Sequence, residues 1–98
     1  MQADQVLDAA KALIGEHGET YDAKGGERSV APTVQALNAL TGQDLTEAQG
    51  WLFLLLLKQR RLFTAPGFHQ DSGIDAAAYA ALTAEAKAKA KAKEALGK

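Results

Sequence analysis

The 98-residue chain contains no cysteine, which excludes disulfides, thiolate zinc sites and cysteine nucleophiles. Aromatic residues are scarce at 6%, and only two prolines interrupt the chain. The longest apolar run is the seven-residue stretch Trp51–Leu57, far short of the roughly 20 residues needed to span a bilayer. No basic segment followed by an apolar one opens the chain, so no secretion signal is expected. These absences predict a cytoplasmic protein that does not enter a membrane.

What is present favours helices. Hydrophobic residues make up 47% of the chain, and alanine and leucine dominate among them, both of which are strong helix formers. The length corresponds to a single domain with a modest core, which often gains stability by oligomerising. We therefore predict an all-α protein.

The net charge of −1 conceals an asymmetry. Residues 1–85 carry eleven acids and six Lys or Arg, whereas residues 86–98 carry five lysines and one glutamate. The acidic body has no broad basic surface, so specific nucleic-acid binding is not expected. For the Lys/Ala-rich residues 86–98 we predict a solvated helical extension or frayed tail, with weak nonspecific binding to nucleic acid as the alternative.

Helical periodicity and capping signals divide residues 1–85 into four helices, at about 4–16, 30–41, 47–63 and 72–85. Gly18 is expected to end the first helix, and residues 18–28 are expected to form a loop. Thr46 and Ser72 each begin a capping-box pattern. Short connections favour a compact antiparallel four-helix bundle. Because Trp51–Leu57 is apolar on every side, this helix is expected to be wrapped by neighbours or by another subunit.

Two polar clusters flank the predicted turn at residues 64–70. Lys58 and Arg61 share one face near the end of the third helix, whereas Asp71, Asp75 and Tyr79 follow at intervals of four. The short turn should bring the cations and carboxylates together. Carboxylates can hold Mg²⁺ and Lys or Arg can neutralise phosphate oxygens, so this pattern predicts an anion and metal site.

The same residues have a purely structural interpretation, which the sequence leaves open. The cations would then complement the dipole at the end of a helix, and Asp75 would be the capping partner of Ser72. His69 stands alone and is expected to be structural or solvated. The acidic and aromatic residues Glu19 and Tyr21, in the expected loop, could line a site.

Five short segments, in this order, resemble the MazG-like, all-α nucleoside triphosphate pyrophosphohydrolases and related small phage proteins. They are VLDAAKALI (6–14), ETYD (19–22), LTEA (45–48), LLLKQRRL (55–62) and HQDSGIDAAAYAAL (69–82). The resemblance implies a homodimer or homotetramer in a bacterial host cell that acts on (deoxy)nucleotides with Mg²⁺.

Carried over by position, the resemblance makes Asp71 and Asp75 metal ligands and adds Glu47 as a third catalytic carboxylate. It makes Lys58 and Arg61 phosphate-binding residues, with Glu19, Tyr21 and Tyr79 as further substrate contacts. The E-x-x-E pair typical of active relatives is not intact here. Two alternatives to the hydrolase are therefore a nucleotide binder without catalysis and a structural helical interaction protein.

Overall fold

The computed structural model describes the backbone of residues 1–24 and 30–96, and the side chains of residues 1–15 and 30–96. Four helices make up nearly all of this part of the chain: α1 Ala3–Lys24, α2 Val30–Thr41, α3 Glu47–Thr64 and α4 Gln70–Leu96. No strand occurs in the described residues, so the all-α prediction is confirmed. None of the helices, within the described residues, has an apolar stretch long enough to cross a bilayer.

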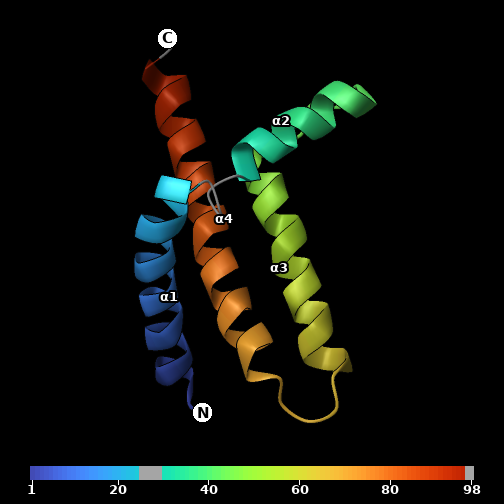
Figure 1. Cartoon of the computed structure of the whole chain (residues 1–98). Helices are drawn as coiled ribbons and strands as arrows, with labels where there is room; N and C mark the ends of the chain where they lie inside the picture. Colours follow the sequence, from blue (N-terminus) through green and yellow to red (C-terminus); the bar gives the residue numbers. More distant parts are fainter. Residues whose placement is uncertain (25–29, 97–98) are drawn as a thin grey trace.

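An antiparallel hairpin of α3 and α4 forms the centre of the molecule, and α1 lies along the other side of α4 (Figure 1). The core between α3 and α4 contains two large buried side chains, Trp51 at 1% exposed and Leu82 at 8%. Among the side chains that the structure describes, the remaining buried apolar residues are small, being Val34 and five alanines, Ala10, Ala48, Ala76, Ala78 and Ala86. A core of this composition removes little apolar surface from water, and the hydrophobic stabilisation of a lone chain is correspondingly modest.

The start of α3 matches its sequence signal. Thr46 is the N-cap, and its hydroxyl accepts a hydrogen bond from the backbone N–H of Gln49 at 3.2 Å. The Gln49 side chain accepts one in return from the backbone N–H of Thr46 at 2.8 Å. The predicted capping box is therefore confirmed, and α3 begins at Glu47 as expected.

Among the described helices, α2 packs mainly against α3 and projects away from the others, while Val30 at its start packs against the core cluster (Figure 1). Its position on α3 is held by Asn38, whose side chain exchanges two hydrogen bonds of 2.9 Å with the backbone of Leu45. Gly50 of α3 lets α2 approach closely, because a Cβ there would lie 2.7 Å from a Val34 methyl and 2.9 Å from a Val30 methyl. Between the two helices, Gly42 has a φ of 72°, a left-handed conformation that glycine adopts at low cost.

Two boundaries differ from the sequence prediction. α1 does not stop at Gly18 but continues to Lys24, so the first part of the expected loop is helical backbone. α4 begins at Gln70, which places Ser72 inside the helix instead of at its cap.

In the described residues α2 packs mainly on α3, so one chain alone does not close a four-helix bundle. A closed bundle stays a prediction that would need an assembly.

Candidate functional site

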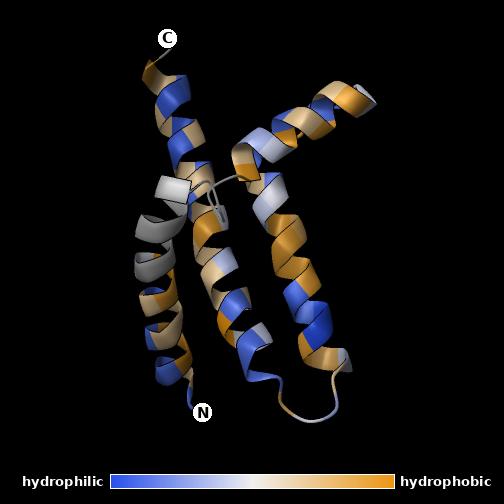
Figure 2. Cartoon of the chain, viewed as in Figure 1, coloured by the Kyte–Doolittle hydropathy of each residue, from blue (hydrophilic) through white to orange (hydrophobic). Residues whose placement is uncertain are grey.

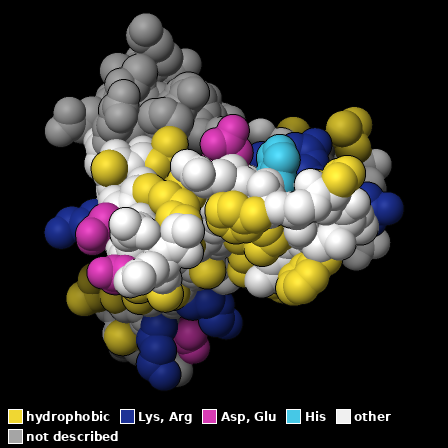
Figure 3. Space-filling view, turned by 90° about the horizontal axis from the view of Figure 1, so that it is seen from below, with side chains coloured by type: hydrophobic (Ala, Val, Ile, Leu, Met, Phe, Trp, Pro, Cys, Tyr) yellow, Lys and Arg dark blue, Asp and Glu magenta, His cyan; other side chains and the backbone are white. Residues whose placement is uncertain are grey.

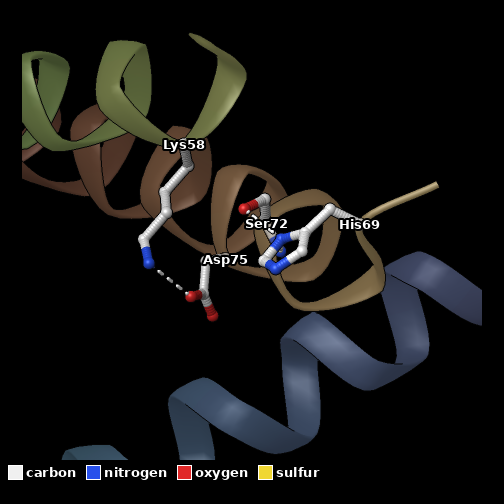
Figure 4. Close-up of polar contacts among 4 residues, drawn as sticks. All are labelled: Lys58, His69, Ser72 and Asp75. Atoms are coloured by element: carbon white, nitrogen blue, oxygen red, sulfur yellow. Dashed lines mark hydrogen bonds and ion pairs between the residues drawn. The ribbon is translucent and has the colours of Figure 1, made fainter. Parts of the chain in front are cut away.

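The turn at residues 65–69 brings the end of α3 against the start of α4, where Lys58 and Asp75 meet. The Lys58 Nζ lies 3.0 Å from the Asp75 Oδ2, and the two side chains are 18% and 25% exposed (Figure 4). Partial burial shields this pair from solvent more than a surface ion pair. A cation of α3 and a carboxylate of α4 therefore meet here, as expected. Each of the two charges is neutralised by the other.

His69 and Ser72 form a second contact beside this pair (Figure 4). The His69 Nδ1 lies 2.6 Å from the Ser72 hydroxyl oxygen and accepts from the Ser72 backbone N–H at 3.3 Å. The His69 carbonyl also accepts from the Gly73 N–H at 3.2 Å. His69 is thus the residue that caps α4. The predicted capping box of Ser72 with Asp75 is wrong, because Ser72 is the third residue of the helix and Asp75 pairs with Lys58.

The other members of the two clusters do not join this pair. Asp71 precedes Asp75 by one helical turn and is exposed, and Arg61 is exposed at the end of α3. Neither forms an ion pair within the described part of the chain. Arg60, which is also exposed, extends the cationic end of α3.

Glu47 lies at the opposite end of α3. Eleven residues separate it from Lys58, which corresponds to about 16 Å along a helix axis. Its Oε2 accepts a hydrogen bond of 3.0 Å from the Trp51 indole N–H. Tyr79 packs its ring against Trp51, with a centroid distance of 5.7 Å. Glu47 therefore belongs to the surroundings of Trp51, and the structure does not bring it to Asp71 and Asp75.

Glu19 and Tyr21 fall on backbone that belongs to α1 instead of the expected loop, and their side chains lie outside the described residues. Among the residues whose side chains are described, no three His, Asp or Glu gather closely enough to hold a metal ion. Mg²⁺ takes a near-octahedral set of oxygen ligands, whereas Asp75 is engaged by an ammonium group and Asp71 stands exposed one turn away. Mg²⁺ at this position therefore stays a prediction, in which Asp71 and Asp75 would hold it together with substrate phosphates.

Comparison with known proteins adds no assignment: no family model, curated protein or solved structure matches this chain. The resemblance to MazG-like hydrolases consequently stays a prediction from short motifs.

The sequence predicted that the all-round apolar segment Trp51–Leu57 would be covered by neighbours or by another subunit, and the structure leaves part of this segment exposed. Of the seven residues in Trp51–Leu57, Leu52, Phe53 and Leu56 are 43%, 69% and 55% exposed. Phe63 is 85% exposed, and Leu52, Leu56 and Phe63 recur at helical spacing, so these three share one side of α3. On α2, Leu37 and Leu40 are 45% and 87% exposed. We call these six residues the α2–α3 face.

Apolar positions recur along both helices in the hydropathy-coloured view (Figure 2). Seen from the end that carries the 65–69 turn, apolar side chains emerge in several groups between polar ones (Figure 3). Single exposed hydrophobic residues are normal on proteins, but several large ones on two adjoining helices indicate an interaction surface. The all-round apolar pattern of Trp51–Leu57 was the sequence signal for the α3 part of this surface.

Proposed function

We propose that the protein is a helical interaction module that docks a partner on the α2–α3 face. The observation that carries this proposal is the exposure of Leu37, Leu40, Leu52, Phe53, Leu56 and Phe63, in a chain whose own core contains two large side chains. α3 places its most apolar segment partly in solvent while alanines fill much of the interior. Covering the exposed face would supply apolar burial that the lone chain lacks.

Leu56→Glu tests the docking function, with Leu7→Glu of α1 as the matched control. Leu56 is 55% exposed and Leu7 is 64% exposed, so neither change should unfold a lone chain, and glutamate is a good helix former. We expect Leu56→Glu to alter one of two measurements. It should lower the fluorescence of the apolar dye ANS on a bare face, or lower the mass of an assembly in solution. If Leu56→Glu matches Leu7→Glu in both, the α2–α3 face has no docking function.

The cationic end of α3 supports a second candidate, which is capture of a nucleotide phosphate without catalysis. Arg60 and Arg61 are exposed and take part in no ion pair with a described residue, and Lys58 lies one turn from Arg61. Guanidinium groups bind phosphate oxygens through two parallel hydrogen bonds. The partial burial of Lys58 beside Asp75 would place a third cation near the same phosphate, once it exchanges partners.

Nucleoside triphosphates in the presence of EDTA should raise the melting temperature of the chain if this second candidate is correct. A ligand at 100 times its dissociation constant stabilises the folded state by about 2.7 kcal/mol. We expect Arg61→Glu to abolish the shift and Lys11→Glu, an exposed change on α1, to preserve it. An equal shift in both variants would place the nucleotide elsewhere. Release of pyrophosphate when Mg²⁺ is added would support the hydrolase predicted from the family resemblance.

A further inference from the structure

We propose that the partner of the α2–α3 face is a second copy of this chain, related by a two-fold axis. Each copy would then present the same six apolar side chains to its equivalent. This inference rests on the proposed docking function and names its occupant. Three independent features of the structure favour a second copy: the area left exposed, the low charge of residues 30–57, and the placement of α2 on α3.

The exposed area matches the requirement of a dimer. The accessible surface of the chain is 7000 Å², against about 5400 Å² for a compact monomer of this mass. The Cα radius of gyration is 14.8 Å, against about 12.6 Å for a typical domain of this length. Among the described residues, 87–96 at the end of α4 are all exposed, and large apolar side chains of α2 and α3 are exposed as well.

The six side chains of the α2–α3 face can supply an interface by themselves. Leu40 and Phe63 are the most exposed of them at 87% and 85%, and Leu52 is the least at 43%. With about 200 Å² for each complete large apolar side chain, the exposed portion amounts to roughly 800 Å² per copy. A stable interface of standard size buries about 800 Å² on each partner. One second copy is therefore sufficient to cover this face.

Charge is sparse from Val30 to Leu57, the stretch that carries five of the six residues of the α2–α3 face. From Val30 to Leu57 the only ionisable side chains are Asp44 and Glu47, and α2 has none. Glu47 is already hydrogen-bonded to the Trp51 indole. When a face packs on its own copy, any charge near the axis meets a like charge, which destabilises the contact. The uncharged part of the face, from Leu37 to Leu56, suits this self-contact, whereas Lys58, Arg60 and Arg61 lie in the chain between Leu56 and Phe63.

The orientation of α2 is fixed before any partner arrives. Asn38 ties α2 to the backbone of Leu45 through two hydrogen bonds, and Val30 and Val34 pack on Gly50. These contacts use one side of α2 and leave Leu37 and Leu40 exposed. A preorganised surface loses less conformational entropy on association than a flexible one. Pairing α2 and α3 with a second copy would also close the bundle that one chain leaves open.

Sedimentation equilibrium of the full chain over a range of concentrations tests the second copy directly. The wild type should approach twice 10.3 kDa, or 20.6 kDa. Leu40→Glu and Leu56→Glu should each raise the dissociation constant by about 100-fold or more, because each change buries a charge twice in a symmetric interface. Leu7→Glu should leave the mass unchanged. Circular dichroism should show that all three variants retain their helices, since these side chains are exposed in one chain.

The outcomes separate the second copy from the docking function. The wild-type chain could stay at 10.3 kDa while Leu56→Glu lowers its ANS fluorescence. This result overturns the proposal of a second copy, but it leaves the proposal that the face docks another partner. A monomer whose ANS signal is equal in Leu56→Glu and Leu7→Glu overturns both. An assembly that survives Leu40→Glu and Leu56→Glu uses a different surface, which also overturns this proposal. Loss of the assembly in both variants, with Leu7→Glu unchanged, supports it.

Discussion

Replacement of Trp51 by alanine should remove about 3–5 kcal/mol from the free energy of unfolding, as for other buried Trp→Ala changes. Trp51 is 1% exposed and is the largest fully buried side chain of the described residues. It contacts the core formed with Ala48, Leu82 and Ala86, and Tyr79 packs on its ring. Alanine at position 51 would leave a cavity that the neighbouring alanines are too small to fill.

Urea unfolding followed by circular dichroism measures this loss, at one chain concentration for all variants so that any self-association contributes equally. Trp51→Phe is the informative control. It retains an aromatic ring against Tyr79 but removes the hydrogen bond to Glu47, so its loss should be smaller than that of alanine. An alanine variant within about 1 kcal/mol of the wild type would show that the core does not depend on this side chain.

Local sequence patterns predicted where the helices begin and end better than they predicted how the helices pack on one another. The helices at Val30–Thr41 and Glu47–Thr64 coincide with their predicted ranges to within one residue. Both are defined by signals within the segment itself, namely apolar periodicity and the Thr46 capping box. At Gly18 the local signal failed, because α1 continues through it. A glycine weakens a helix by only about 1 kcal/mol, which other interactions can offset.

The start of α4 illustrates a different limit. The S-x-x-D pattern at Ser72 matches a capping box, yet the cap is His69, whose imidazole accepts the backbone N–H of Ser72. Ser72 is itself 1% exposed inside the helix. Histidine is not among the preferred N-cap residues. The sequence pattern therefore predicted the N-cap at Ser72, three residues after the residue that caps the helix.

Only the contact between residues close in the sequence could be predicted for the candidate site. Lys58 and Asp75 meet because a short turn joins two antiparallel helices, and antiparallel pairing follows from the length of that turn. Glu47 was assigned by resemblance alone, and its distance along α3 separates it from Asp75. Which apolar residues stay exposed depends on the direction in which α2 leaves α3. That direction depends on the Asn38 hydrogen bonds and on Gly50, neither of which a periodicity pattern reveals.

Gly50→Val should detach α2 from α3. The Cβ atom alone would lie 2.7 Å and 2.9 Å from methyls of Val34 and Val30, and valine adds two further methyls at the same place. The facing valines have stiff side chains, so the helices themselves must separate. Overpacking of this kind typically costs about 1–3 kcal/mol. Because α2 packs mainly on α3 among the described helices, we expect it to leave the fold as a unit.

A detached α2 should unfold, since an isolated helix of 12 residues is marginal in water. The helical signal in circular dichroism should fall by the share of α2, while α1, α3 and α4 remain folded. Gly15→Val of α1 is the matched control: outside its own helical turn, no atom of the described residues lies within 4 Å of a Cβ there, so stability should change by no more than about 0.5 kcal/mol. If the chain forms the proposed dimer, Gly50→Val should also dissociate it, although position 50 lies outside the six residues of the α2–α3 face. Retention of both the helical signal and the assembly would contradict the argument that the placement of α2 creates this surface.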